Sequence, residues 1–353
     1  MQTCKPTHDL MVALLLIMLS TACKKQTFET YLVATYATNN PSGALTGRID
    51  SLLLGGPTNI ATDTRDNLYL TDMGNHIIRK IDQGGRVTLL AGEGNSFADG
   101  VGRSAKFNYP LGIAVDATGI IYVADRENQR IRKALPNGQV STLAGNGIIG
   151  SSDGDGKDAQ FYNPVGIAVD AQGNLYIADS ENHRIRKITP AGIVSTIAGT
   201  TRGYADGGAN KARFNDPVDV ALDNAENIYI VDRNNHCIRK ITPNGTVSTV
   251  AGTGKPGFAN GTGEKALFNG PRGITIDKHG NLYIADSGNN RIRKIASDGK
   301  VSTIAGNGTA GFANGYSEKA KFNEPWDIEV NANGDLLYVA DRNNQSIRTI
   351  QLH

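Results

Sequence analysis

Short runs of apolar, mostly β-branched residues recur along the chain, separated by turn-forming pairs that often contain glycine. One stretch shows the pattern, with the runs VGIAVD (165–170), NLYIAD (174–179), RIRKIT (184–189) and IVSTIAG (193–199). Runs of about four to eight such residues are typical of β-strands. Apolar side chains occupy both odd and even positions of NLYIAD, so we expect a sheet that is buried on both faces. The pattern predicts an all-β protein built from four-stranded units.

The same unit occurs six times. An Asp ends the second predicted strand of each unit, and its copies lie 53 to 55 residues apart, at Asp72, Asp125, Asp179, Asp232, Asp286 and Asp341. A Tyr stands three residues before each Asp, an Asn three residues after it and an Arg seven residues after it. Repetition at a fixed period is the signature of a repeat architecture. We place the repeats at about residues 57–106, 107–160, 161–213, 214–267, 268–321 and 322–353.

The two ends of the repeat region predict how the units are arranged. The last repeat stops after a third strand, SIRTIQLH, whereas residues 31–37 (YLVATYA) supply a strand in excess before the first repeat. We therefore expect residues 31–37 to pair with residues 346–351 and to close a ring, which removes an exposed sheet edge. The predicted fold is a six-bladed β-propeller of four-stranded blades over residues 31–353, in which the N-terminal strand completes the last blade.

The segment before the repeats has the features of an export signal. Lys5 is followed by the apolar run LMVALLLIML (10–19), by the small residues of Ser-Thr-Ala and then by Cys23. This order is typical of a secretory signal peptide, and the apolar run is shorter than the roughly 20 residues that span a bilayer. The cysteine after small residues resembles a bacterial lipobox. We expect residues 1–22 to be a signal peptide, Cys23 to be lipidated and residues 23–30 to form a lipidated tether; ordinary cleavage near Ala22 is the alternative.

Charge and cysteine content narrow the possible partners. The net charge is only +2, so no strong field favours nucleic acid or an anionic membrane surface. Cys4 leaves with the signal peptide and Cys237 is then the one thiol of the repeat region, which predicts no intrachain disulfide. We expect a monomer on the cell envelope, at the outer membrane of a Gram-negative bacterium, that meets the membrane through its lipid anchor alone.

Residues that recur in every repeat are most simply explained by the construction of a blade. A turn Asp or Asn can hydrogen-bond to its own backbone, and the recurring Arg can pair with buried acceptors. The segment DGDGKD (153–158) faintly resembles a calcium loop, but it aligns with the ADG and ANG turns of the other repeats. His76, His183 and His236 share one repeat position, and equivalent points on a six-fold ring lie too far apart to hold zinc at about 2.1 Å. No cofactor is predicted.

The sequence resembles the NHL-repeat propellers. The turns Asn75-His76, Asn182-His183 and Asn235-His236 carry the resemblance, together with the longer pattern AG.G..GFA[DN]G…A.FN.P.GI.[VI]D. The pattern is similar to that of NHL proteins of bacterial surfaces, and it covers residues 31–353. The resemblance implies a six-bladed propeller. NHL and related propellers include ligand-binding sensors, protein- and RNA-binding domains, an amidating lyase and lactonase-like hydrolases, so the resemblance leaves the function open.

Residues that differ between the repeats are the candidates for a unique site. One set follows the Pro that opens each first strand, and its distinctive members are Asp219, Arg272, Trp326 and Asp327. A second set follows the Asp of the turn, where repeats two, four and six carry Arg126, Arg233 and Arg342. We expect both sets on one face, with the three arginines forming a three-fold positive ring, because Trp and Arg are enriched where proteins bind ligands. The alternative is a mouth closed by Arg–Asp pairs.

The sequence predicts a non-catalytic binding or scaffold module whose ligand is a glycan, a peptide or a protein. RNA binding is excluded by the small net charge and by export. No nucleophile stands in a recognisable elbow, and no glycine-rich loop leads into a helix. The alternative function is a metal-assisted lyase or lactonase-like hydrolase at the channel mouth, which requires carboxylate, Asn or His side chains from at least three blades to converge.

Overall fold

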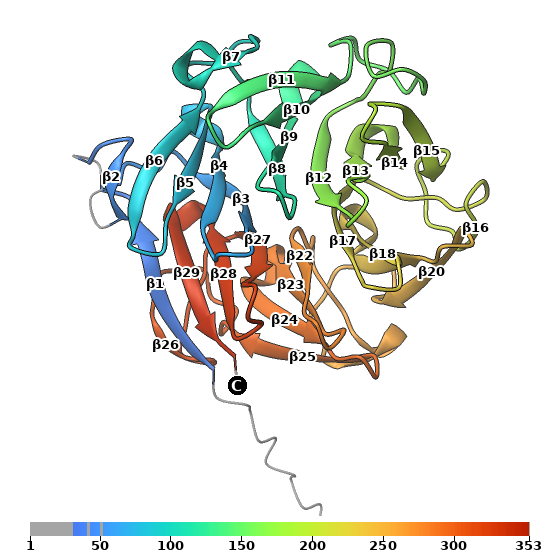
Figure 1. The fold of residues 1–353 in the computed structure, drawn as a ribbon. Coiled ribbons are helices and arrows are strands. Elements are labelled where there is room, and N and C mark those ends of the chain that lie inside the picture. Colours follow the sequence, from blue (N-terminus) through green and yellow to red (C-terminus); the bar gives the residue numbers. More distant parts are fainter. Residues whose placement is uncertain (1–30, 41–42, 50–51, 353) are drawn as a thin grey trace, which may run out of the picture.

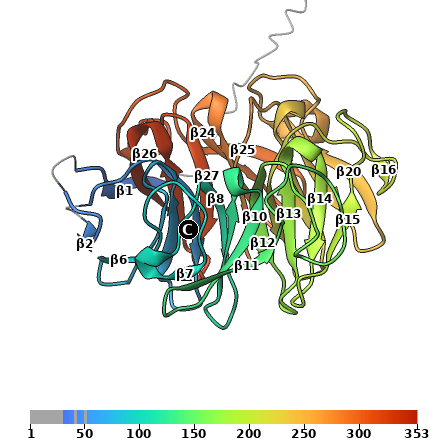
Figure 2. The ribbon, with the colours of Figure 1, turned by 90° about the horizontal axis from the view of Figure 1, so that it is seen from above.

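The computed structural model describes residues 31–40, 43–49 and 52–352, which form six antiparallel sheets around a central axis. Figure 1 shows the sheets arranged as the blades of a propeller, and Figure 2 shows the ring turned by 90°. The predicted all-β, six-bladed propeller is therefore confirmed. The predicted signal peptide, Cys23 and the tether lie outside the described residues.

Blade 1 contains β3 (Pro57–Thr62), β4 (Leu68–Asp72), β5 (Ile77–Ile81) and β6 (Arg86–Ala91). Blade 2 contains β8 (Pro110–Val115), β9 (Ile121–Asp125), β10 (Arg130–Ala134) and β11 (Gln139–Ala144). Blade 3 contains β12 (Pro164–Val169), β13 (Leu175–Asp179), β14 (Arg184–Ile188) and β15 (Val194–Ala198). In each blade the first strand lies nearest the axis, and apolar residues of adjacent blades share common core clusters.

Blade 4 contains β17 (Pro217–Leu222), β18 (Ile228–Asp232), β19 (Cys237–Ile241) and β20 (Thr246–Ala251). Blade 5 contains β22 (Ile274–Ile276), β23 (Leu282–Asp286), β24 (Arg291–Ile295) and β25 (Lys300–Ala305). Blade 6 contains β27 (Pro325–Val330), β28 (Leu336–Asp341), β29 (Ser346–Gln351) and the N-terminal strand β1 (Leu32–Thr38). No helix among the described residues is long and apolar enough to cross a membrane.

Five of the six sheets carry a fifth, two-residue strand at the outer edge, which the sequence did not predict. These strands are β2 (Gly47–Arg48), β7 (Gly100–Val101), β16 (Gly207–Gly208), β21 (Gly261–Thr262) and β26 (Gly315–Tyr316). Four of them begin at the glycine of the ADG or ANG segments. In blade 3 the equivalent Gly154 forms a single bridge with Val194. The recurring glycine therefore covers the outer edge of its blade as well as forming a turn.

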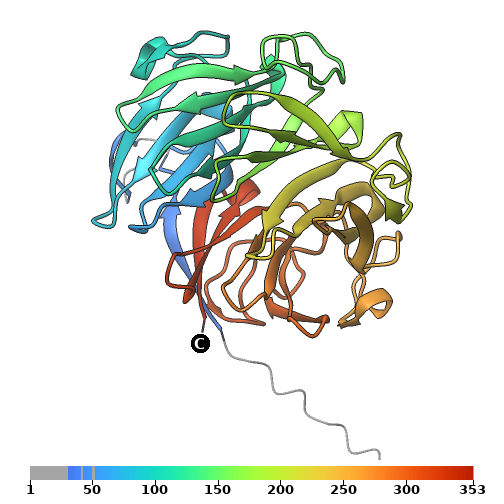
Figure 3. The same ribbon diagram turned by 45° about the vertical axis from the view of Figure 1, so that its right-hand side comes forward.

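The N-terminal strand closes the ring as predicted. Strand β1 lies between β26 and β29, and it pairs with β29 from Leu32 opposite Gln351 to Thr38 opposite Ser346. Figures 1 and 3 show the C-terminal end beside the start of β1. The first and last segments of the propeller thus complete one blade, in which β29 has a partner strand on both sides.

A buried arginine braces each blade. In blade 2, Arg132 donates to Asp125 at 2.6 Å, to Asp99 at 2.6 Å and to two backbone carbonyls. Asp125 also accepts from the side chain of Asn128 at 2.9 Å and from the backbone amide of Asn108 at 2.8 Å. All six equivalent arginines are fully buried. The recurring Arg thus has the predicted buried acceptors, but the Asp reaches the preceding loop rather than the backbone of its own turn.

The three repeated histidines join neighbouring blades. His76 ends the turn after β4 in the left-handed conformation, with a φ of 56°. Its Nδ1 accepts from the backbone amide of Tyr109 in the next blade at 3.1 Å, and His183 and His236 accept from Asp216 and Gly270 in the same way. Each histidine therefore has a structural partner of its own, at a separate junction of the ring.

Candidate ligand-binding site

A cavity of about 410 Å³ opens on the face that carries the turns between second and third strands. We call this face the top face and the cavity the top pocket. Five of the seven residues predicted from the sequence line it, namely Arg126, Arg233, Arg272, Trp326 and Arg342. The structure thus brings together residues from blades 2, 4, 5 and 6 that are separated by up to 216 positions in the chain.

Three of these arginines come from equivalent turns. Arg126, Arg233 and Arg342 each begin a short 3₁₀ turn, and each turn directly follows the Asp that braces the blade. The Asp is fixed by the buried arginine and by a backbone amide, so the position after it is held at the rim of the pocket. This anchoring of the turn explains why the three predicted arginines lie at the rim.

Nearby carboxylates partly neutralise the ring, which the sequence analysis missed. Arg233 pairs with Asp216 at 3.2 Å and Arg342 pairs with Glu324 at 3.5 Å. Asp216 and Glu324 both directly precede the Pro that opens a first strand. The same position holds Gly56, Tyr109, Asn163 and Gly270 in the other repeats. The sequence did contain a signal for these ion pairs. Repeats four and six, which carry Arg233 and Arg342 in the turn, both have an acidic residue before the Pro.

Arg272 and Trp326 are two neighbouring members of the pocket lining. Each follows the Pro that opens the first strand of its blade, and their side chains are in contact. The Cζ atom of Arg272 lies 3.6 Å from the centroid of the Trp326 ring, and the Cζ atom of Arg342 lies 4.2 Å from it. Burial lowers the pKa of Arg272 to about 10, and the positive charge of Arg233 adds to the effect. Its burial and the nearby charge of Arg233 thus mark Arg272 as a cation that the pocket leaves poorly stabilised.

The remaining lining of the top pocket includes an apolar patch. Leu111, Val165 and Val218 belong to one buried core cluster, against which Met73 packs. Leu111, Val165 and Val218 each follow the Pro, at the same repeat position as Arg272 and Trp326. Met73 instead follows the turn Asp of blade 1. The pocket therefore offers an apolar surface from blades 1 to 4 beside arginines that come from blades 2, 4, 5 and 6.

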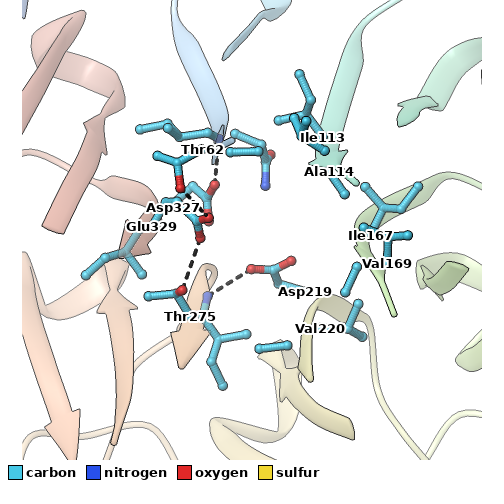
Figure 4. Close-up of a pocket in the computed structure, with 18 of the residues that line it drawn as sticks. Thr62, Ile113, Ala114, Ile167, Val169, Asp219, Val220, Thr275, Asp327 and Glu329 are labelled. Carbon is cyan, nitrogen blue, oxygen red and sulfur yellow. Dashed lines mark hydrogen bonds between the residues drawn. The ribbon is translucent and has the colours of Figure 1, made fainter. Parts of the chain in front are cut away.

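Asp219 and Asp327 do not line the top pocket, which corrects the prediction that placed them with the arginines. They line a second cavity of about 220 Å³ along the axis, which we call the channel (Figure 4). Asp219 is 6% exposed and Asp327 is 4% exposed. Successive side chains of a strand point to opposite sides, so Asp219, which follows Val218, and Asp327, which follows Trp326, turn away from the top pocket.

The channel carboxyl groups bind backbone amides instead of arginines. Asp219 Oδ2 accepts from the amide of Ile274 at 2.8 Å, and Asp327 Oδ2 accepts from the amide of Ile60 at 2.8 Å. The alternative of a mouth closed by Arg–Asp pairs does not hold for Asp219 and Asp327, although Arg233 and Asp216 form such a pair at the top pocket. Burial raises the pKa of Asp219 to about 8 and raises that of Asp327 as well.

Glu329 is a third channel carboxyl group, which the sequence analysis did not identify. Its carboxylate accepts from Thr275 at 3.0 Å and from Thr62 at 3.3 Å (Figure 4), and burial raises its pKa to about 7. The same position of the first strand holds Ala61, Ala114, Ala168, Ala221 and Thr275 in the other blades. A single acidic residue among these small ones was the signal that could have found it.

The predicted alternative of a metal-assisted enzyme requires converging ligands from at least three blades. Asp219 comes from blade 4, whereas Asp327 and Glu329 both come from blade 6. Within the described ranges, no three or more His, Cys, Asp or Glu side chains lie close enough together to hold a metal ion. Asn59 of blade 1 also lines the channel, but among the described residues the structure gives this alternative no cluster of His, Cys, Asp or Glu ligands.

Comparison with known proteins identifies the repeats. The model of the NHL repeat matches residues 107–134, 161–188, 214–241, 268–295 and 322–350. NHL repeat-containing protein 2 of Homo sapiens is 31% identical over 327 residues, which cover 81% of this chain and 45% of that protein. The chain spans less than half the length of this and two other curated relatives that it matches.

Two solved structures show the same architecture. An auxiliary nutrient binding protein from Bacteroides thetaiotaomicron superposes with a TM-score of 0.70 at 19% identity, over 91% of this chain and 76% of that one. A streptogramin B lyase superposes with a TM-score of 0.56 at 14% identity, over 92% of this chain and 99% of that one. At these identities the likeness concerns the fold alone. The repeats, the sheet order and the ring closure together identify the chain as a member of the NHL-repeat family of six-bladed β-propellers.

Proposed function

We propose that this propeller is a binding module of the cell envelope that takes an anionic ligand at the top pocket. One observation carries the proposal: five of the residues that vary between otherwise similar blades line one cavity, and four of them are arginines. Guanidinium groups bind carboxylate and sulfate through paired hydrogen bonds. An acidic or sulfated glycan, an acidic peptide and an acidic protein loop are the ligand types that match this lining.

The shape of the pocket supports a ligand that reaches several blades. Arg126, Arg233 and Arg342 begin equivalent turns in every second blade, so a compact anion at one of them does not touch the other two. Glu127, Asp216 and Glu324 pair with the three ring arginines and Glu181 also lines the pocket, so among the described residues Arg272 is the pocket arginine without an ion pair. An extended or multiply anionic ligand would use this arrangement best.

The proposed location rests on the N-terminal sequence. An apolar run that ends in Ser-Thr-Ala-Cys23 indicates export and lipidation of that cysteine. The solved neighbour from Bacteroides thetaiotaomicron, whose name describes a nutrient binding protein, supports a binding role for this fold. We infer that the propeller is displayed on the envelope and meets its ligand outside the cytoplasm.

The test removes the ring while it preserves the fold. Replacing Arg126, Arg233 and Arg342 by Ser copies the residue that blades 3 and 5 carry at the same position, so the variant should fold normally. Binding to an array of neutral, carboxylated and sulfated glycans and acidic peptides should fall at least tenfold, and its dependence on salt should weaken. The matched control replaces Arg86, Arg103 and Lys300, three exposed cations outside the pocket, by Ser.

Two outcomes decide the proposal. If the control binds like the parent and the ring variant does not, the top pocket is the binding site. If the ring variant keeps the affinity and the salt dependence of the parent, the ligand binds elsewhere and the proposal is wrong.

A further inference from the structure

Arg272 differs from the other three arginines of the top pocket in having no carboxylate of its own. Arg126 pairs with Glu127 at 2.7 Å, and the carboxylates nearest to Arg272, Asp216 and Glu324, pair with Arg233 and Arg342. Among the described residues no carboxylate lies within 4.0 Å of the Arg272 guanidinium. Arg272 is therefore the pocket arginine to which the described residues supply no ion-pair partner.

Contacts with Trp326 hold this guanidinium in place without using its hydrogen-bond donors. Its Cζ atom lies 3.6 Å from the centroid of the indole, a distance at which a cation and an aromatic face attract one another. A guanidinium stacked on a ring keeps its N–H groups at the edge, where they can bind a carboxylate through two parallel hydrogen bonds. In the described part of the chain, no side chain or carbonyl accepts a hydrogen bond from the Arg272 guanidinium.

The electrostatic surroundings favour an anion at this position. Burial removes much of the hydration of the Arg272 charge and Arg233 repels it, and these effects outweigh the attraction of Glu324 and Asp216, so the pKa of Arg272 falls to about 10. A bound anion would offset both effects. The stacked geometry and the absence of an ion partner thus agree with the charge distribution in indicating an anion-binding point in the pocket.

The rest of the lining restricts what carries the anion. Leu111, Val165 and Val218 form an apolar surface in the same cavity, with Met73 beside them. A ligand that fills the pocket therefore needs a carboxylate close to an apolar group. The last residue of a peptide, when its side chain is apolar, has this combination, whereas the carboxylate of a uronic acid is attached to a ring whose other substituents are hydroxyl groups and glycosidic oxygens.

We propose that Arg272 binds the terminal carboxylate of a peptide, and that the apolar side chain of the last residue packs on Leu111, Val165 and Val218. This inference rests on the proposed function, because it takes the top pocket as the ligand site. It assigns the outer arginines to the acidic or polar residues that precede the peptide terminus.

The experiment measures the binding of three probes to the purified mature protein by calorimetry. The probes are an acetylated acidic peptide ending in Leu with a free carboxylate, the same peptide with a C-terminal amide, and a galacturonate oligomer of equal charge. We expect the free acid to bind at least tenfold more tightly than the amide, and more tightly than the oligomer. Equal binding of acid and amide, tighter binding of the oligomer, or no binding of the free acid at millimolar concentration would overturn the inference.

Variants separate this inference from the proposed function. Arg272→Lys keeps the charge but loses the paired hydrogen bonds, and Arg272→Met loses both, so the affinity for the free acid should fall stepwise while that for the amide changes little. Thermal melting of each variant verifies its fold, and Arg86→Met, at an exposed cation outside the pocket, serves as the matched control. If the triple Ser variant loses binding but both Arg272 variants keep the parent preference for the acid, the proposed function stands and the role of Arg272 is refuted.

Discussion

Asp327 accepts a hydrogen bond from the backbone amide of Ile60 across the junction at which the last blade meets the first, with 2.8 Å between Oδ2 and N. Behind it, the first strand of blade 5 comes so close that a Cβ atom on Gly273 would lie 2.5 Å from the Asp327 Cα atom. Asp219 has the same relationship to Gly166 and Ile274, with a distance of 2.4 Å. Each aspartate thus interlocks three consecutive blades around the channel.

Adding a methyl group at Gly273 should destabilise this interlock. The Cβ of Gly273→Ala would collide with backbone of blade 6, which side-chain rotation cannot relieve, so we expect a loss of about 1–3 kcal/mol in the free energy of unfolding. Denaturant titration measures it. The matched control is Gly208→Ala, where the nearest atom to the added Cβ is a side-chain oxygen at 3.5 Å. Equal stability of the two variants would show that the blades can separate without cost.

Glu329 should make the stability depend on pH. Its pKa is raised from 4.5 to about 7, so the folded protein holds this proton more tightly than the unfolded chain. This contribution to stability is complete below pH 4.5 and is lost as the pH rises through 7, by at most about 3 kcal/mol. In Glu329→Gln the free energy of unfolding should fall less steeply between pH 4.5 and 7. The part of the pH dependence that comes from Asp219 and Asp327 should remain. Unfolding curves of parent and variant from pH 4.5 to 8 measure the difference, and parallel curves would contradict the assignment.

The buried brace of each blade should be costly to break on one side. Arg132→Met leaves the fully buried Asp125 without its cation, and we expect a loss of about 3–5 kcal/mol. Removing the charge of the partner as well, in Arg132→Met with Asp125→Asn, should recover part of this loss. Arg126→Met, a half-exposed neighbour on the same turn, should change the stability by no more than about 0.5 kcal/mol. A double variant no more stable than the single one would mean that the ion pair is not the main contribution.

Removal of the closing strand should expose an edge of blade 6. A variant without residues 24–38 lacks all partners of β29 on that side, so we expect aggregation or a large drop in melting temperature. A variant without residues 24–30 keeps β1 and is the control. Identical melting of the two shortened proteins would contradict a role of closure in stability.

The lipid anchor is tested by Cys23→Ser. We expect the variant to leave the membrane fraction, because the thiol that would carry the lipid is absent. Cells grown with labelled fatty acid report lipidation directly. A parent protein that takes up no label would show that the signal is cleaved without lipidation.

The fold could be predicted because six copies of one unit carry the same information, and the surplus strand at one end matches the strand missing at the other. The pocket was predicted in part for the same reason, since residues such as Arg272 and Trp326 stand out against their equivalents. Asp219 and Asp327 were misplaced because the two positions after the Pro were treated as one set, although neighbouring side chains of a strand point to opposite sides.

Other parts of the site depend on contacts that a single repeat does not contain. The pairing of Arg342 with Glu324 joins a turn to the loop before its own blade, and the bonds of Glu329 join blade 6 to blades 1 and 5. The histidine bonds between blades depend on a left-handed turn conformation that has no unique sequence. These features follow from the ring geometry, which sets the distances between different copies.

The direction of β1 determines which side of the propeller a lipid at Cys23 would hold against the bilayer. Leu32 pairs with Gln351, which is opposite Leu336 at the base of β28, whereas Thr38 pairs with Ser346 beside the top face. The chain therefore enters blade 6 on the face opposite the top pocket. Seven residues lie between Cys23 and Tyr31, so the two positions are at most about 29 Å apart. An anchored propeller would rest with its lower face toward the lipid headgroups, and its arginine-lined mouth would open toward the surrounding fluid.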